Sequence, residues 1–164
     1  MYKRQLYDWL ENEPELFYPG DVDHVHSPER MGKMSNFISI NGGVQLDLMG
    51  QENAESAGSR QLSGIGGQMD FLEGAFRSRG GRGYICINSS RRDKEGNLRS
   101  NIVPTIPGGS TISVPRTMVE CVATEYGVAH LHGLSLGERA AAMAAIAHPD
   151  FREELYKYAQ ENFY

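Results

Sequence analysis

The stretch SGIGGQMDFLEGAFRSRGGRGYICINSS, residues 63–90, places a glycine-rich turn, a helix-forming segment and an apolar segment one after another. Residues 68–76 predict a helix that opens at Gly66 and Gly67, and residues 83–90 predict a buried strand. A helix that leads into a buried strand is typical of α/β proteins. With the elements expected on either side, this order predicts an α/β fold with a mixed sheet.

The segments before residue 63 predict a helix, a polar connection and a β-hairpin. Residues 5–17 have apolar side chains at helical spacing, and residues 21–35 are mostly polar. Residues 37–41 and 44–50 alternate apolar and polar side chains around a pair of glycines, which is the pattern of a hairpin.

The segments after residue 90 change from β-forming to helical. A charged turn is followed by three short runs rich in β-forming residues, at 101–106, 110–115 and 119–127. Ser135 and Glu138 then have the spacing of a capping box, and Pro149 suits the first turn of a last helix. The C-terminal third is therefore predicted to be helical.

Composition limits the class of protein. The chain has 164 residues, 40% of them hydrophobic, with no apolar run long enough to span a membrane and no signal-peptide pattern at its start. We expect one cytoplasmic domain whose two cysteines, Cys86 and Cys121, are reduced core thiols. The formal net charge of −5 argues against general nucleic-acid binding, although seven of the sixteen basic residues lie between Arg77 and Arg99.

The glycines at 64, 66 and 67 form a G-x-G-G pattern just before the predicted helix. Such a turn leaves backbone N–H groups unpaired and lets a ligand approach closely, so it can hold a phosphate or a developing oxyanion. The pattern matches neither the dinucleotide fingerprint G-x-G-x-x-G nor the P-loop. A tight turn with purely structural glycines remains the alternative.

Five segments point to one family: INGGVQLDLMGQENAESAG, the stretch at 63–81, NIVPTIPGGSTISVPRT, VATEYGVAHLHGLSLGERA and IAHPDFREEL. In this order they resemble the C-terminal domain of the acetyl-CoA hydrolase/CoA-transferase family, and within it the 4-hydroxybutyrate and butyryl-CoA:acetate CoA-transferases. The resemblance implies an open mixed sheet of the CoA-transferase (NagB/RpiA-like) type with a helical C-terminal third. It covers nearly the whole chain, so residues 1–164 are interpreted as one C-terminal domain.

The resemblance also implies a mechanism. In this family a glutamate attacks the acyl-CoA thioester, and the reaction passes through an acyl-glutamyl anhydride and a glutamyl-CoA thioester. The glutamate belongs to an upstream motif resembling H-T/S-E-M, which this sequence lacks. We therefore expect this chain to be a fragment or a separate subunit that is inactive alone. Residues 1–5 are then a candidate non-native segment. An N-terminal domain or subunit would supply the glutamate.

The expected partners follow from the same resemblance. CoA and small carboxylates are expected as substrates, with no tightly bound cofactor, no metal, no nucleic acid and no membrane. We expect a homo-oligomer. An acyl-CoA hydrolase of the same family and a non-catalytic CoA-binding or assembly module remain the alternatives.

The resemblance assigns site residues by position. Gly67 is the candidate oxyanion donor, and His26 stands where the family tends to have asparagine. Each of these side chains also has an interpretation without ligand contact. Arg82 and Glu55 would be solvated, His26 would be a surface residue, Asn41 would be a turn residue, and Asp70 would favour the helix N-terminus. Glu125 and Tyr126 are interpreted as structural. The predicted CoA-binding residues are Gly64, Gly66, Gly67, Gln68 and Arg82, and the substrate-side residues are His26, Asn41, Glu55 and Asp70.

Overall fold

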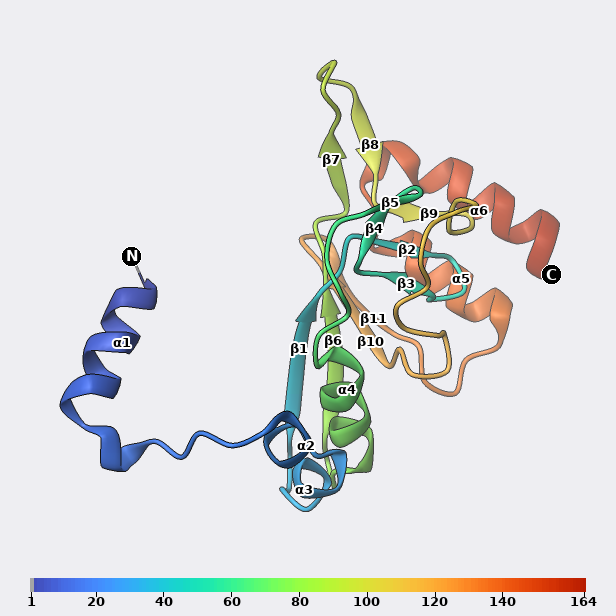
Figure 1. Ribbon diagram of the computed structural model, residues 1–164. Coiled ribbons are helices and arrows are strands. Elements are labelled where there is room, and N and C mark those ends of the chain that lie inside the picture. Colours follow the sequence, from blue (N-terminus) through green and yellow to red (C-terminus); the bar gives the residue numbers. More distant parts are fainter. Residues whose placement is uncertain (1) are drawn as a thin grey trace.

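A four-stranded sheet lies at the centre of the structure, a computed structural model that describes residues 2–164 (Figure 1). The strand order is β1-β6-β10-β11, in which the first three strands run parallel and the last is antiparallel. The mixed sheet of the α/β prediction is confirmed. The bounds are β1 Ile38–Gly42, β6 Arg82–Cys86, β10 Cys121–Thr124 and β11 Gly127–His130.

Helix α4, Gln68–Arg77, covers one face of this sheet, as the opening stretch predicts. Leu72 packs so closely on Gly83 that a Cβ at the glycine would lie 2.8 Å from Leu72 Cδ2. The opposite face is open and carries the exposed side chains of Ile40 and Cys86. The prediction of a buried strand at 83–90 is therefore right for residues 83–86, whereas residues 87–89 lie beyond β6 and one face of the strand is open.

The two cysteines differ in burial. Cys86 is exposed on the open face, which corrects the prediction of two core thiols. Cys121 is buried, and burial raises the pKa of its thiol to about 11. The Cys121 thiol therefore stays protonated at neutral pH and is not a nucleophile.

The predicted hairpin around Gly42 and Gly43 is wrong. Strand β1 pairs with β6, whereas β2, Gln45–Asp47, belongs to a second sheet of order β3-β2-β9. The alternation in the sequence reflects burial on one face of each strand and does not say which strand is the partner. The chain instead crosses between two sheets at these glycines. The other strands of the second sheet are β3, Glu52–Asn53, and β9, Ile102–Val103.

Two short hairpins complete the β structure. The predicted charged turn forms the tip of the hairpin β7–β8, which projects from the body in Figure 1 and carries much of the basic cluster. The run at 110–115 forms only one isolated bridge, between Glu52 and Val114. The hairpin strands are β4 Ser56–Ala57, β5 Arg60–Gln61, β7 Ser90–Arg92 and β8 Leu98–Ser100.

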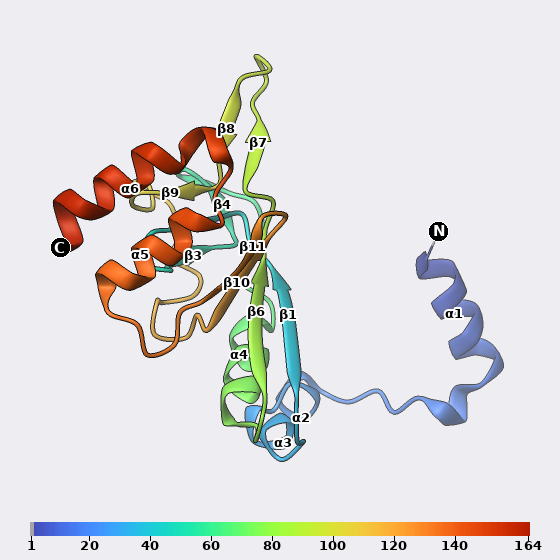
Figure 2. The same cartoon turned by 180° about the vertical axis from the view of Figure 1, so that it is seen from behind.

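The C-terminal third is helical, as predicted. Helix α5, Leu136–Ala145, begins with the capping box between Ser135 and Glu138, and α6, Pro149–Phe163, begins at the proline. Both helices lie beside the second sheet (Figure 2). Their buried side chains, Met143 and Leu155 among them, join Leu46 and Ile102 of that sheet in the hydrophobic core.

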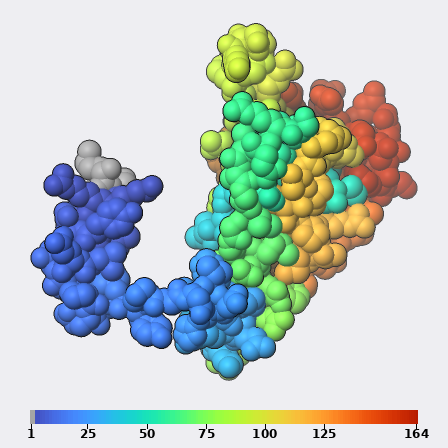
Figure 3. Space-filling model, viewed as in Figure 1, coloured from blue at the N-terminus to red at the C-terminus, as the bar shows by residue number. Residues whose placement is uncertain are grey.

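The N-terminal segment stands apart from this body (Figure 3). Helix α1, Tyr2–Asn12, and a short 3-10 helix, Pro14–Leu16, take the place of the helix predicted at 5–17. The predicted polar connection contains two short helices, α2 Val22–Val25 and α3 Pro28–Gly32, because Asp21 and Ser27 cap them. Within residues 2–164, no helix combines the length and apolar character needed to cross a membrane.

Candidate functional site

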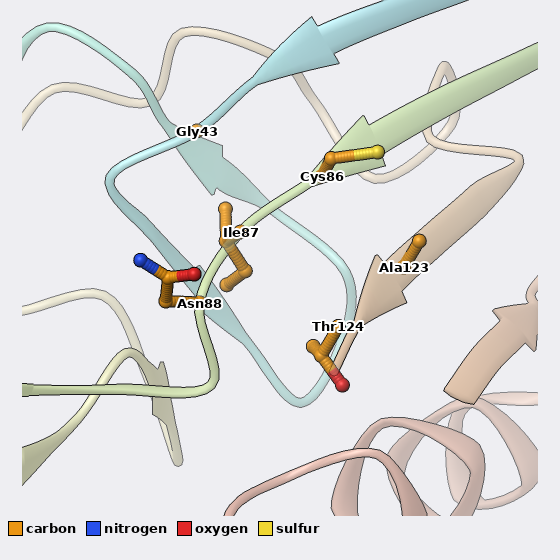
Figure 4. A pocket seen from close by; sticks show the side chains of 6 residues that line it. All are labelled: Gly43, Cys86, Ile87, Asn88, Ala123 and Thr124. Atoms are coloured by element: carbon orange, nitrogen blue, oxygen red, sulfur yellow. The ribbon is translucent and has the colours of Figure 1, made fainter. Parts of the chain in front are cut away.

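A pocket lies where the three parallel strands end. Because β1, β6 and β10 run in the same direction, the residues that follow them meet at one edge of the sheet. An open cavity of about 420 Å³ forms there (Figure 4). Ligands of open α/β sheets bind outside the carboxyl ends of the strands. The lining residues are Gly43, Cys86, Ile87, Asn88, Ala123 and Thr124.

The glycine-rich turn lies at the same end of the sheet. Helix α4 leads back into β6 and runs antiparallel to it, so the N-terminus of α4 lies near the carboxyl end of β6 (Figure 1). Gly66 has a φ of +61°, which favours glycine, and Gly67 is the N-cap residue, without a capping side chain. The first N–H groups of α4 are thus left for other partners.

A buried carboxylate connects this turn to the pocket. Glu52 on β3 is fully buried, and its two oxygens accept hydrogen bonds from Gln68 Nε2 at 2.9 and 2.7 Å. A Cβ at Gly43 would lie only 2.5 Å from Glu52 Oε1. Burial raises the pKa of Glu52 to about 7, against the opposing effect of the Gln68 hydrogen bond. Sequence reasoning missed Glu52, because residues 51–61 are polar and small and give no sign that this carboxylate is buried.

Two of the predicted substrate-side residues lie at the turn. The ring of His26 packs against Gly67 and, at 4.9 Å between centroids, edge-on against Phe71. His26 Nδ1 is buried and, among the described residues, makes no hydrogen bond. The backbone carbonyl of Glu55 accepts the N–H groups of Leu62 and Ser63, which lead into the turn. The structure therefore brings His26 to Gly67, and it brings the backbone of Glu55 to the residues just before the turn.

Of the other predicted residues, Asp70 also lies close to the turn, whereas Arg82 does not. Asp70 lies in the first turn of α4. Asn41 lies on β1 and donates a hydrogen bond to Ser39 Oγ at 2.7 Å. Arg82 is the first residue of β6, and a strand of this length separates it from the pocket edge by roughly 13 Å. There it donates to Gly81 O and lies 3.3 Å from Glu120, so the structure does not bring it to the turn.

The basic residues between Arg77 and Arg99 also lie in different parts of the structure. Arg91 and Arg99 lie on the β7–β8 hairpin, which leaves the sheet at the pocket end. Arg91 donates to Asn101 Oδ1, and Arg99 donates to Asp93, lowering the pKa of that carboxyl to about 2. These hydrogen bonds are local to the hairpin and its base.

Glu125 joins two segments at the edge of the pocket. One of its oxygens accepts the Ser89 N–H at 2.9 Å and the other accepts the Ser89 hydroxyl at 2.6 Å. Burial would raise the pKa of Glu125, but the Ser89 hydrogen bonds outweigh it and the pKa is lowered. The contact ties the end of β10 to the loop after β6, in agreement with the structural interpretation.

The comparison with known proteins decides the family. A family model described as the acetyl-CoA hydrolase/transferase C-terminal domain matches residues 3–159. The chain belongs to this family. The resemblance drawn from the five sequence segments is therefore confirmed.

Individual members of the acetyl-CoA hydrolase/transferase family are similar over nearly the whole chain. The butyryl-CoA:acetate CoA-transferase of Anaerostipes caccae is 44% identical over 158 residues, which cover 96% of this chain and 35% of that protein. The 4-hydroxybutyrate coenzyme A transferase of Clostridium kluyveri is 44% identical over 160 residues, covering 98% and 36%. The crystal structure of RipA from Yersinia pestis has a TM-score of 0.75 at 40% identity, covering 85% of this chain and 31% of RipA. The chain thus spans about a third of the length of these relatives.

Proposed function

We propose that this chain is the CoA-holding part of an acyl-CoA:carboxylate CoA-transferase that acts on short-chain acyl groups such as 4-hydroxybutyryl, butyryl or acetyl. Membership of the family and the names of the similar proteins support this class of reaction. The observation that carries the proposal is the position of the Gly64–Gly67 turn. It opens the N-terminus of α4 at the pocket end of the sheet.

The turn suits the chemistry of thioester attack. When a carboxylate attacks an acyl-CoA, negative charge develops on the thioester carbonyl oxygen and needs preorganised donors. Backbone N–H groups at the start of a helix are such donors, and the Gly67 N–H is the proposed one. Glycine at this position also leaves room for the His26 ring.

The nucleophilic glutamate is proposed to lie on a segment upstream of this chain. Two carboxylates of this chain that lie near the pocket are unsuited to the role. Glu52 is fully buried and bonded to Gln68, and Glu125 is bonded to Ser89 through both oxygens, so neither carboxylate is free to attack a thioester. A further domain or subunit would complete the site at the pocket.

The products distinguish transfer from hydrolysis. A longer protein that contains this chain, given butyryl-CoA and acetate, is expected to form acetyl-CoA, which chromatography detects. Free CoA without acetyl-CoA would contradict transfer and favour the hydrolase. The chain alone is expected to bind CoA in calorimetry without consuming thioester. An absence of heat at millimolar CoA would contradict a preformed CoA site.

The role of the Gly67 N–H can be tested by comparing a substitution that keeps this group with one that removes it. Gly67→Pro and Gly67→Ala both add a Cβ against His26, but only proline removes the N–H. Because loss of one oxyanion donor costs about 100-fold, Gly67→Pro is expected to lower kcat/KM of the longer protein about 100-fold relative to Gly67→Ala. Gly108→Ala, at a glycine with open space around it, is the control. Equal activity of the proline and alanine variants would rule out this donor.

A further inference from the structure

Glu52 is a buried acid that the proposed chemistry does not use. Its side chain is fully buried, and no opposite charge contributes to the shift in its pKa. A buried carboxylate without an ionic partner is costly, and an apolar or amide side chain would be cheaper. A group that costs stability at a binding site is a candidate for a functional role.

The contacts of Glu52 show what it holds. Gln68 is the first residue of α4 and follows Gly67 directly, so the hydrogen bonds from its side chain fix the start of the helix. On its other side, Glu52 Oε1 lies 2.5 Å from the place that a Cβ of Gly43 would take, and Gly43 lines the pocket. One carboxylate therefore links the glycine-rich turn to the pocket wall.

We propose that Glu52 is a positioning residue, which holds the Gly66–Gly67 turn in place against the pocket wall at Gly43 by binding Gln68. The consequence for CoA rests on the proposed function, since the turn is the proposed CoA site. The holding of the turn itself does not depend on that function. Gln68 is 7% exposed, so loss of its acceptor would leave a buried amide unsatisfied and favour local opening of the turn.

The contact between Glu52 and Gln68 is also sensitive to pH near neutrality. An opening that exposes Glu52 to water returns its pKa from about 7 to the ordinary 4.5, so opening becomes easier as the pH rises through this range. The groups shown against Glu52 are the uncharged Gln68 of α4 and the uncharged Gly43, and the backbone of Glu52 bridges to Val114. On neighbouring elements, Asp47 of β2 accepts hydrogen bonds from Gln51 and from the Met49 N–H, and His26 lies against Gly67.

Hydrogen exchange at the start of α4 tests the proposal without any ligand. Three proteins are compared: the wild type, Glu52→Gln, which retains an acceptor for Gln68, and Glu52→Leu, which does not. Protection of the amides of Phe71 and Leu72, the first in α4 with backbone acceptors, is expected to be about tenfold lower in the leucine variant than in the glutamine variant. In the wild type it is expected to fall about tenfold between pH 6 and pH 8, whereas in Glu52→Gln it stays constant. Amides of α6 are the internal control.

Several outcomes would overturn the proposal. One is equal protection of the Phe71 and Leu72 amides in the leucine and glutamine variants. Another is a loss of protection that extends equally to α6, and a third is the same pH response in Glu52→Gln as in the wild type. Should Glu52→Leu fail to fold, Gln68→Leu removes the same contact from the other side and is expected to expose the same amides.

Calorimetry with CoA separates the two proposals. Glu52→Leu is expected to weaken CoA binding about tenfold relative to Glu52→Gln, because the turn would be open for more of the time. If the wild type binds no CoA, the proposed CoA site fails, while the exchange result still decides whether Glu52 holds the turn. If CoA binds equally to both variants, Glu52 does not position the CoA site.

Discussion

Replacing Arg139 by methionine is expected to lower the free energy of unfolding by about 3 kcal/mol. Arg139 is a buried residue of α5, and its guanidinium donates hydrogen bonds to three backbone carbonyls. The distances are 2.8 Å to Met49 O, 2.9 Å to Leu131 O and 2.8 Å to Arg116 O. Methionine fills similar space but donates nothing, so these carbonyls lose their partner where water does not readily replace it.

Urea denaturation of this chain measures the loss. Arg77→Met is the matched control, because Arg77 is exposed and its one ion pair within residues 2–164 is with Glu73, one helical turn away. Such a surface pair is worth at most about 0.5 kcal/mol. A loss below about 1 kcal/mol for Arg139→Met would mean that Arg139 does not hold α5 to the loops after β2 and β11.

Replacing Glu52 by glutamine is expected to remove a pH-dependent loss of stability of about 3 kcal/mol. The folded-state pKa of Glu52 is about 7, above the ordinary 4.5, so the folded chain binds the proton more tightly than the unfolded chain does. The wild type therefore loses stability as the pH rises from about 4.5 to 7 and pays the full cost above pH 7. Glutamine keeps a hydrogen-bond acceptor for Gln68 and does not titrate.

The difference in unfolding free energy between the wild type and Glu52→Gln isolates the contribution of Glu52. Asp93, Glu125 and Glu138 have lowered pKa values, so they stabilise the fold above their unfolded pKa and act in the opposite direction on acidification. They are the same in both proteins and cancel in the subtraction. Urea midpoints at pH 4.5, 6 and 8 are expected to show Glu52→Gln gaining on the wild type as the pH rises. A constant difference would mean that the pKa of Glu52 is not raised.

Local structure around the opening stretch could be predicted from the sequence. The glycine pair at 66 and 67, the helix after it and the strand after that are properties of neighbouring residues, as is the capping box at Ser135. Backbone freedom and side-chain spacing act over a few residues, so they are visible in the sequence. The family was also recognisable, because five segments in one order carry more information than any single motif.

The same reasoning could not predict which distant segments pair with each other. The alternation around Gly42 and Gly43 predicted a hairpin, whereas β1 pairs with β6 some forty residues away. Arg82 follows the glycine-rich stretch closely in sequence, yet the direction of β6 places it at the end of the strand away from the pocket. A strand pattern reports which face is buried, and the packing of the whole domain chooses the partner.

The sequence by itself determined the α/β class, the glycine-rich turn that opens α4 and the family to which the chain belongs. Only the tertiary structure decided that this turn shares one end of the sheet with the pocket, and that Glu52 links the two through Gln68 and Gly43. The physical reason is that turns and helix ends depend on local backbone preferences. The neighbours and the raised pKa of a buried carboxyl depend instead on which distant segments exclude water from it.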